Sequence, residues 1–262
     1  MSTDSDVEAA LNLVSKRIDF LEFLDGERRP KRVISEELGY SRSTVNRAIA
    51  KLSDAGLVDD APRGCQTTFV GSLLADQYDE YVRVSTTILA NREVLTSLSL
   101  DTKLPSIVLT DAEVTTPGDS SPYGPFNAVE ALLERAVGQV RVYVPTFTNP
   151  RGIELAQGLA TKMDVEIVFD GALISELRSD IPTQIQTLVK LDNFTGYTTS
   201  TGPNYSLIIV TTESGLEGAI VIHTAEKELV GCLVSENPDA TQWMEQRYAE
   251  IRAESEPLQT AF

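Results

Sequence analysis

The sequence is poor in the side chains from which metal centres and disulfide frameworks are built. It has two cysteines and one histidine in 262 residues. Cys65 and Cys232 are far apart, and neither belongs to a Cys-x-x-Cys pair, so they indicate neither a zinc site nor a disulfide framework. We expect both to be small packed residues, because free cysteine is among the most buried residue types. The sequence therefore predicts no metal and no cofactor.

Long apolar runs are also missing. No run of about 18 apolar residues occurs, and the first ten residues, MSTDSDVEAA, are acidic. These features argue against a transmembrane helix and a secretory signal peptide, so we expect a cytoplasmic protein without a membrane partner. The hydrophobic content of 42% is enough for a real core. The length favours two modest domains over one.

Positive charge is scarce and unevenly placed. The formal net charge is -17, with 7 Lys and 15 Arg. This composition is typical of proteins from a salt-saturated, haloarchaeal-type cytoplasm, because surface charge keeps proteins dispersed where salt promotes association. The alternative is an ordinary acidic protein. Residues 28–63 nevertheless hold 8 basic and 5 acidic side chains, whereas residues 71–262 hold 12 and 27. A basic segment in an acidic chain indicates contact with nucleic acid.

Helical spacing of apolar residues is clear in the N-terminal part. Residues 7–24 predict a first helix, and Pro30 suits the first turn of a second. Ser41 is a good N-cap for a third helix, from about Arg42 to Asp54. One face of that helix should pack on the first two; its residues are Val45, Ala48, Ile49 and Leu52.

The opposite face of the third helix is made of short or hydrogen-bonding side chains. A helix that enters a major groove needs such a surface, because Asn and Arg can pair with base edges. The segments LVDD and QTTFV then predict two short strands joined by APRGC, with Arg63 near the tip. Three helices followed by a β-wing describe a winged helix-turn-helix.

The stretch SRSTVNRAIAKLSDAGLV resembles the S-x-S-T-V-x-R-x-L-x-x-L-x-x-x-G-L-[VI] core of bacterial and archaeal transcription regulators. The resemblance implies binding to double-stranded DNA. Base or nearby phosphate contacts would come from Ser43, Thr44, Asn46 and Arg47, with the capping Ser41 beside them. Backbone contacts would come from Arg28, Arg29, Lys31, Arg32, Arg42, Lys51 and Arg63. The alternative is a protein-interaction adaptor that retains a winged helix without binding DNA.

A long helix should follow the wing. From Gly71 the pattern is helical for over twenty residues, and we assign residues 71–103 to this linking segment. A helix in this position often pairs with its copy in a homodimer, which places two half-sites about one DNA turn apart. The alternative is that it packs only on its own domain.

Residues 104–262 change to alternating strands and helices. Strands are expected in SIVLTDAEV, QVRVYVP and DVEIVFD, with helices between and after them. Four further strand-like runs precede a last helix that begins in NPDATQW. This order predicts a mixed α/β domain. The fold class is thus α/β and α, with a DNA-binding domain at 1–70, the long helix at 71–103 and an α/β regulatory domain at 104–262.

The last helix carries the pattern A-x-x-W-x-x-x-x-Y-x-x-x-R-x-x-S-x-P, from Ala240 to Pro257. It resembles the sensor domain of archaeal winged-helix regulators of the methanogenesis regulatory type. In those domains the strand before a turn often carries Asp pairs, and here TTESG stands in their place. The resemblance implies a sensor role and leaves the ligand open.

Enzymatic residues are not evident. His223 lies in the apolar run AIVIHT, where a packed or edge-strand histidine is expected rather than a base. No G-x-S-x-G, P-loop or G-x-G-x-x-G occurs. We therefore expect a regulator rather than an enzyme. A small-molecule effector site is predicted where strands end, because ligands of α/β sheets bind there. Its candidate residues are Thr146, Phe147, Asn149 and Asp170. The alternative is that these are ordinary loop and capping residues.

Overall fold

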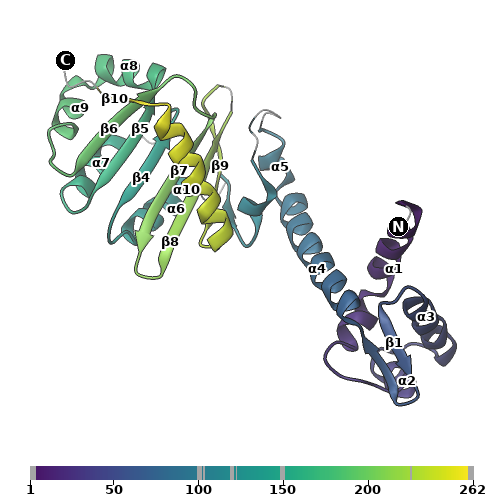
Figure 1. The fold of residues 1–262 in the computed structure, drawn as a ribbon. Coiled ribbons are helices and arrows are strands. Elements are labelled where there is room, and N and C mark those ends of the chain that lie inside the picture. Colours follow the sequence, from purple (N-terminus) through teal and green to yellow (C-terminus); the bar gives the residue numbers. More distant parts are fainter. Residues whose placement is uncertain are drawn as a thin grey trace. The chain divides into compact units, whose positions relative to one another are not determined.

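A computed structural model of the chain describes residues 4–98, 102, 104–118, 121, 123–147, 151–224 and 226–258. The chain divides into two compact units, residues 1–85 and 86–262 (Figure 1). Helix α4 (Phe69–Ala90) begins in the first unit and ends in the second.

The N-terminal unit begins with three helices: α1 (Asp4–Phe23), α2 (Lys31–Glu37) and α3 (Arg42–Asp54). The predicted third helix is confirmed residue for residue, and its four apolar residues are buried as expected. Ile49 is fully buried, which stabilises the fold by about 2 kcal/mol. Gly56 follows the helix at φ +72°, a conformation in which glycine is unstrained.

The strands of the N-terminal unit form a two-stranded antiparallel hairpin of β1 (Val58–Ala61) and β2 (Gly64–Thr67). Pro62 and Arg63 make the turn, so the expected position of Arg63 is confirmed. The second strand lies earlier than the predicted QTTFV. The reason is Thr68, whose hydroxyl accepts the Gly71 N–H at 3.1 Å. Helix α4 therefore starts at Phe69, and the last three residues of the predicted strand lie outside β2.

Helix α4 spans 22 residues, which confirms the predicted long helix. Its inner side packs on the core of the N-terminal unit through Leu74, Ala75 and Tyr78. It ends at Ala90, and a short α5 (Arg92–Leu95) follows. Asn91 separates the two helices, with its side-chain amide donating to the Thr87 carbonyl at 2.9 Å. The predicted segment is therefore two helices rather than one.

The C-terminal unit is built on an eight-stranded mixed sheet in the order β10-β6-β5-β4-β7-β8-β9-β3. Its strands are β3 (Glu113–Thr115), β4 (Val140–Val144), β5 (Val165–Asp170), β6 (Phe194–Thr199), β7 (Tyr205–Thr212), β8 (Gly215–His223), β9 (Leu229–Ser235) and β10 (Glu256–Pro257). Strands β4, β5 and β6 are parallel, and the other pairings are antiparallel. The predicted mixed α/β sheet is confirmed.

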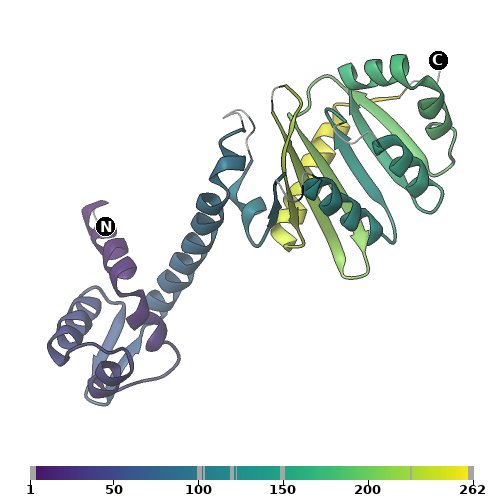
Figure 2. The ribbon, with the colours of Figure 1, turned by 180° about the vertical axis from the view of Figure 1, so that it is seen from behind.

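Helices cover both faces of this sheet, which is why its central strands are almost wholly apolar. One face carries α6 (Gly124–Glu134), α7 (Gly152–Ala160), α8 (Gly171–Asp180) and α9 (Pro182–Leu188), and the other carries α10 (Pro238–Ala253) (Figures 1 and 2). Side chains alternate between the faces: Val142 and Val144 pack under α6 and α7, whereas Tyr143 packs with α10.

The predicted strand at 106–114 is wrong in its first half. Residues Ser106–Leu109 form a short 3-10 helix, η2, and pairing with β9 begins only at Glu113. Pro105 sets the entry into this helical turn (φ -75°), and Asp111 reverses the chain at φ 55°. Val108 and Leu109 are still buried, so the apolar run marks core residues without forming a strand.

The signature residues of α10 anchor that helix to the sheet. The Tyr248 hydroxyl donates to the Glu166 carboxylate at 3.0 Å. The Arg252 guanidinium stacks 3.0 Å from the Tyr197 ring centre and lies 3.7 Å from Glu166. The Tyr and the Arg of the pattern are thus explained by contacts of α10 with β5 and β6.

Both cysteines are buried and unpaired with each other, as predicted. Burial raises the pKa of Cys65 to about 11 and that of Cys232 to about 12. Within the residues that the structure describes, none of the helices is both long and apolar enough to cross a membrane.

Candidate functional site

The exposed face of α3 carries side chains that are free to meet another molecule. Ser43, Asn46 and Arg47 are exposed on it. Ser41 holds the start of the helix: its Oγ accepts the Thr44 N–H at 3.2 Å and lies 2.9 Å from the hydroxyls of Ser43 and Thr44. Such a cap stabilises a helix by about 1 kcal/mol. Asn46 and Arg47 thus project from a helix whose start is fixed.

Four cations of the predicted DNA contact set are paired with carboxylates of their own unit. The nitrogen–oxygen distances are 2.5 Å for Arg28–Asp59, 3.2 Å for Arg29–Glu27, 2.5 Å for Lys31–Asp60 and 2.6 Å for Arg32–Glu36. The hydrogen bond from Lys31 lowers the pKa of the Asp60 carboxyl, against the effect of its burial. A phosphate would have to compete with these carboxylates.

Arg28 and Arg29 also hold the hairpin in place. Arg28 Nη1 donates to the Gly64 carbonyl at 2.7 Å. The backbone of Arg29 exchanges two 2.8 Å hydrogen bonds with Cys65, and its guanidinium stacks 4.2 Å from the Phe23 ring centre. Gly64 is required there, because a Cβ would lie 2.7 Å from the Arg29 carbonyl oxygen. These two arginines thus have a structural role that the sequence did not reveal.

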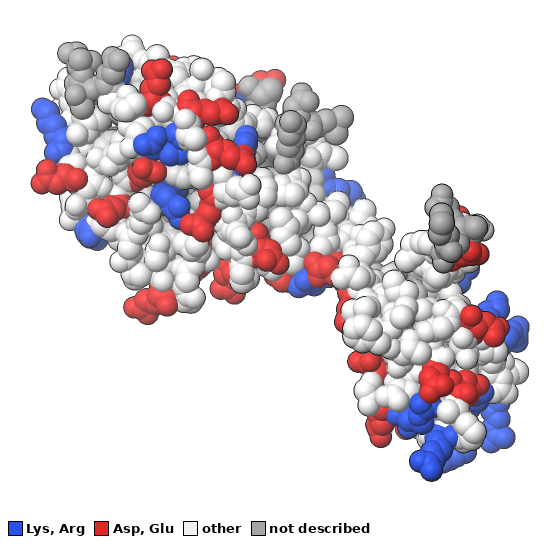
Figure 3. Space-filling view, in the orientation of Figure 1, with Lys and Arg blue, Asp and Glu red and all other residues white. Residues whose placement is uncertain are grey.

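The remaining cations of the set are Arg42, Arg47 and Lys51 on α3 and Arg63 in the hairpin turn. All four are exposed, and in the described part of the chain none of them forms an ion pair. Figure 3 shows Lys and Arg gathered at the end of this unit that carries α2, α3 and the hairpin. The structure thus leaves a cationic surface on α3 and the turn.

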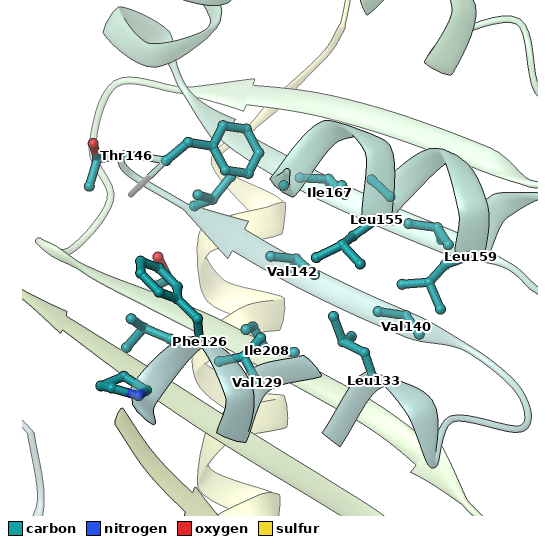
Figure 4. Close-up of a pocket in the computed structure, with 18 of the residues that line it drawn as sticks. Phe126, Val129, Leu133, Val140, Val142, Thr146, Leu155, Leu159, Ile167 and Ile208 are labelled. Carbon is teal, nitrogen blue, oxygen red and sulfur yellow. The ribbon is translucent and has the colours of Figure 1, made fainter. Parts of the chain in front are cut away.

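The C-terminal unit contains an apolar cavity of about 110 Å³ between one face of the sheet and helices α6 and α7. Apolar side chains make up most of its wall. Those labelled in Figure 4 are Phe126, Val129, Leu133, Val140, Val142, Leu155, Leu159, Ile167 and Ile208. Within the described chain, no Lys, Arg, Asp or Glu lines it.

The polar groups of the cavity lie at one end. Thr146 follows β4, and Figure 4 shows it away from Leu159, at the opposite end. Ser206 is placed by the β4–β7 register at the same end as Thr146, because Tyr143 pairs with Leu207. Ser206 Oγ lies 3.1 Å from His223 Nε2. The other ring nitrogen, Nδ1, is buried and has no hydrogen-bond partner among the described residues.

His223 is a neutral core histidine rather than an exposed base. Its side chain is 2% exposed, and burial lowers its pKa to about 4. Of the packed and edge-strand positions that the sequence allowed for this histidine, the structure shows the packed one. Its partner Ser206 was not predicted. Ser206 and His223 alternate with apolar residues along β7 and β8. This period-2 spacing could have indicated that both side chains lie on the sheet face that α6 and α7 cover.

The structure places two of the four predicted effector residues at the cavity. Thr146 and Phe147 line the cavity. Asp170 does not line it. Its carboxylate accepts the Ala172 N–H at 2.9 Å and caps α8, so Asp170 is a capping residue, as in the alternative interpretation. Asn149 lies outside the described residues.

The N-terminal unit thus presents an exposed helix face with polar and cationic side chains. The C-terminal unit contains an apolar cavity. The sequence profile of the methanogenesis regulatory protein FilR1, middle domain, matches residues 122–254, just over half of the chain. The chain therefore belongs to that family. A second profile, the HVO_A0261 N-terminal domain, matches residues 5–89. No curated protein matches the sequence.

Three solved structures resemble the chain at low sequence identity. A structure of TrmBL2, titled as an archaeal chromatin protein with a novel mode of DNA binding, is 12% identical, with a TM-score of 0.46 over 83% of this chain and 84% of that one. NucT from Helicobacter pylori is 12% identical, with a TM-score of 0.43 over 56% and 99%. The phospholipase D family member Nuc from Salmonella typhimurium is 14% identical, with a TM-score of 0.42 over 57% and 98%. At these scores the matches do not define a function.

Proposed function

We propose that the chain is a sequence-specific DNA-binding transcriptional regulator. The observation that carries the proposal is the division of α3 into two faces. One face is buried core. The other exposes Asn46 and Arg47 beside Arg42 and Lys51, which form no ion pair among the described residues. In this proposal the N-terminal unit is a winged helix-turn-helix, α3 enters the major groove and the β1–β2 hairpin is the wing.

Asn46 and Arg47 are the base-reading residues of the proposal. Asn can pair bidentately with adenine and Arg with guanine in the major groove. Arg42, Lys51 and Arg63 contact phosphates, since their guanidinium and ammonium groups have no carboxylate partner among the residues that the structure describes. Phosphate contacts fix the orientation of the helix, and base contacts supply the sequence preference.

A homodimer is the proposed DNA-binding form. Val70, Leu73 and Tyr81 lie on one side of α4, and each is at least 49% exposed. Val7 and Leu11 of α1 are similarly exposed, at 49% and 53%. Apolar side chains grouped in this way mark an interaction surface. Pairing of two copies through these residues would cover them, and the dimer would carry two α3 helices.

The C-terminal unit is the regulatory part of the proposal, in keeping with a family named for a regulatory protein. An effector in its cavity changes DNA binding only if it favours one arrangement of the chain over another. The net charge of -17 fits a cytoplasm at high salt, as in haloarchaea, where base contacts matter more than counterion release.

Mapping of DNA bound by the protein in cells, followed by footprinting with the purified full chain, tests this function. The proposal predicts protection of two half-sites about one helical turn apart within the mapped sequences. Recovery of bound proteins without protected DNA would instead support an adaptor.

A further inference from the structure

The cavity of the C-terminal unit combines three features of a built ligand site. Its volume is about 110 Å³, its wall is almost wholly apolar, and its polar groups are at one end. Apolar cavities of about 150 Å³ in proteins stay dry and take up benzene. This cavity is somewhat smaller and therefore suits a compact molecule of about six non-hydrogen atoms.

The second observation is the nitrogen that has no partner. His223 is 98% buried, and its Nε2 is engaged by Ser206 Oγ at 3.1 Å. Nδ1 is buried without a partner among the described residues, in a side chain that lines the cavity. Buried polar atoms are hydrogen-bonded in the great majority of proteins. An unsatisfied one costs about 1–3 kcal/mol, so a ligand that supplies the missing bond gains binding energy there.

The chemistry of the missing partner follows from the two tautomers of the ring. When Nε2 donates to Ser206, Nδ1 is an acceptor; when Ser206 donates to Nε2, Nδ1 carries the hydrogen and donates. A hydroxyl group can satisfy either state. A carboxylate is disfavoured, because no cationic side chain of the described chain lines the cavity and an unpaired buried charge is costly.

We infer that this cavity binds a small uncharged molecule with an apolar body and one hydroxyl group, the hydroxyl bonding to His223 Nδ1. The apolar body lies against Val142, Val144 and Ile208, the apolar lining residues nearest to Ser206 in the β4–β7 register. Ser206 is a positioning residue, because it fixes the imidazole through Nε2. This site is the effector site of the regulator proposed above, and that link rests on the proposed function; binding itself does not.

Phenol, toluene and benzoate are the probes for the test. Phenol and toluene have the same heavy-atom shape and differ in one hydroxyl, while benzoate adds a charge. Titration of the full chain is followed through methyl resonances, without DNA. We expect saturable binding of phenol, toluene bound more weakly by about two- to tenfold, and no binding of benzoate.

Four variants locate the site. Ala156→Leu fills the cavity and should abolish phenol binding, with the fold checked by cooperative unfolding. His223→Phe keeps a ring and removes both nitrogens, so phenol should bind no better than toluene. Ser206→Ala should weaken phenol binding, whereas Ser235→Ala, the same change at a buried serine outside the cavity, should not. If Ala156→Leu does not fold, the His223 and serine variants still decide the polar contact.

The outcomes separate this inference from the proposed function. Absence of saturable phenol binding, or binding that Ala156→Leu leaves intact in a folded protein, overturns the site. Equal affinities for phenol and toluene, or tighter binding of benzoate, overturn the assigned ligand class. Phenol binding with unchanged affinity for operator DNA keeps the site and contradicts the regulatory link alone.

Discussion

Lys31 Nζ lies 2.5 Å from Asp60 Oδ2, so a cation of the basic segment is paired with the hairpin. An exposed pair of this kind contributes less than about 1 kcal/mol to stability. Its larger consequence is for DNA binding, because a cation that already has a carboxylate gains little from a phosphate. Lys51 on α3 has no such partner in the described chain, and the two lysines form a matched pair for experiment.

Lys51→Ala should weaken operator binding and make its salt dependence shallower, by about 0.9 per protomer in the slope of log affinity against log salt. Lys31→Ala should leave that slope unchanged. Affinities measured on one duplex over a range of KCl concentrations provide the comparison. Equal loss of slope in both variants would show that the paired lysines also contact phosphate.

Buried His223 should make the stability of the C-terminal unit depend on pH. The unfolded chain takes up the proton near pH 6.5 and the folded chain only near pH 4. Between these values the unfolded state binds more protons, so stability falls as pH falls, by on the order of 3 kcal/mol in all. Below about pH 4 this contribution no longer changes.

Urea unfolding from pH 7 to 4 measures the effect, with His223→Phe as the comparison because carboxylates titrate over part of this range. The free energy of unfolding of the wild type minus that of His223→Phe should fall by most of that amount as the pH is lowered. A constant difference would mean that the folded histidine titrates normally.

Leu73→Glu should convert the proposed dimer into a monomer, because the charge would be buried against the second copy. Analytical ultracentrifugation in high salt gives the mass directly. Val137→Glu is the control. Val137 is likewise apolar and exposed, at 57%, but it lies in the other unit. A wild-type chain that sediments as a monomer would remove the dimer from the account.

Carboxylate repulsion in the N-terminal unit should make it sensitive to salt. The pKa of Glu22 is raised by burial first and then by Asp79 and Asp19. Asp79→Asn should therefore slow amide exchange of α1 in low salt. This added protection should vanish near 1 M KCl, where the Debye length is about 3 Å. Glu8→Gln removes the same charge from an exposed position of α1 and should have little effect. A gain that persists at high salt would point to packing instead.

Local patterns predicted the elements of the fold well, and tertiary contacts explain the rest. Helix α3 follows from its apolar spacing and from Ser41 and Gly56, all visible in the sequence. The 106–109 turn could not be separated from a strand, because a short apolar run has no distinguishing period. The ion pairs of Lys31 and Arg28 join segments about thirty residues apart, and the cavity depends on the β4–β7 register, so neither was accessible to local reasoning.

The central claim is that Asn46 and Arg47 read bases, and its most direct measurement is the affinity of the full chain for a footprinted operator. Asn46→Ala and Arg47→Ala should each lower that affinity by between about fivefold and a hundredfold, with little effect on unrelated DNA. Arg32 is paired with Glu36, so the Arg32→Ala variant should bind the operator nearly as tightly as the wild type. Unchanged operator affinity in an Asn46→Ala, Arg47→Ala double variant would contradict the account.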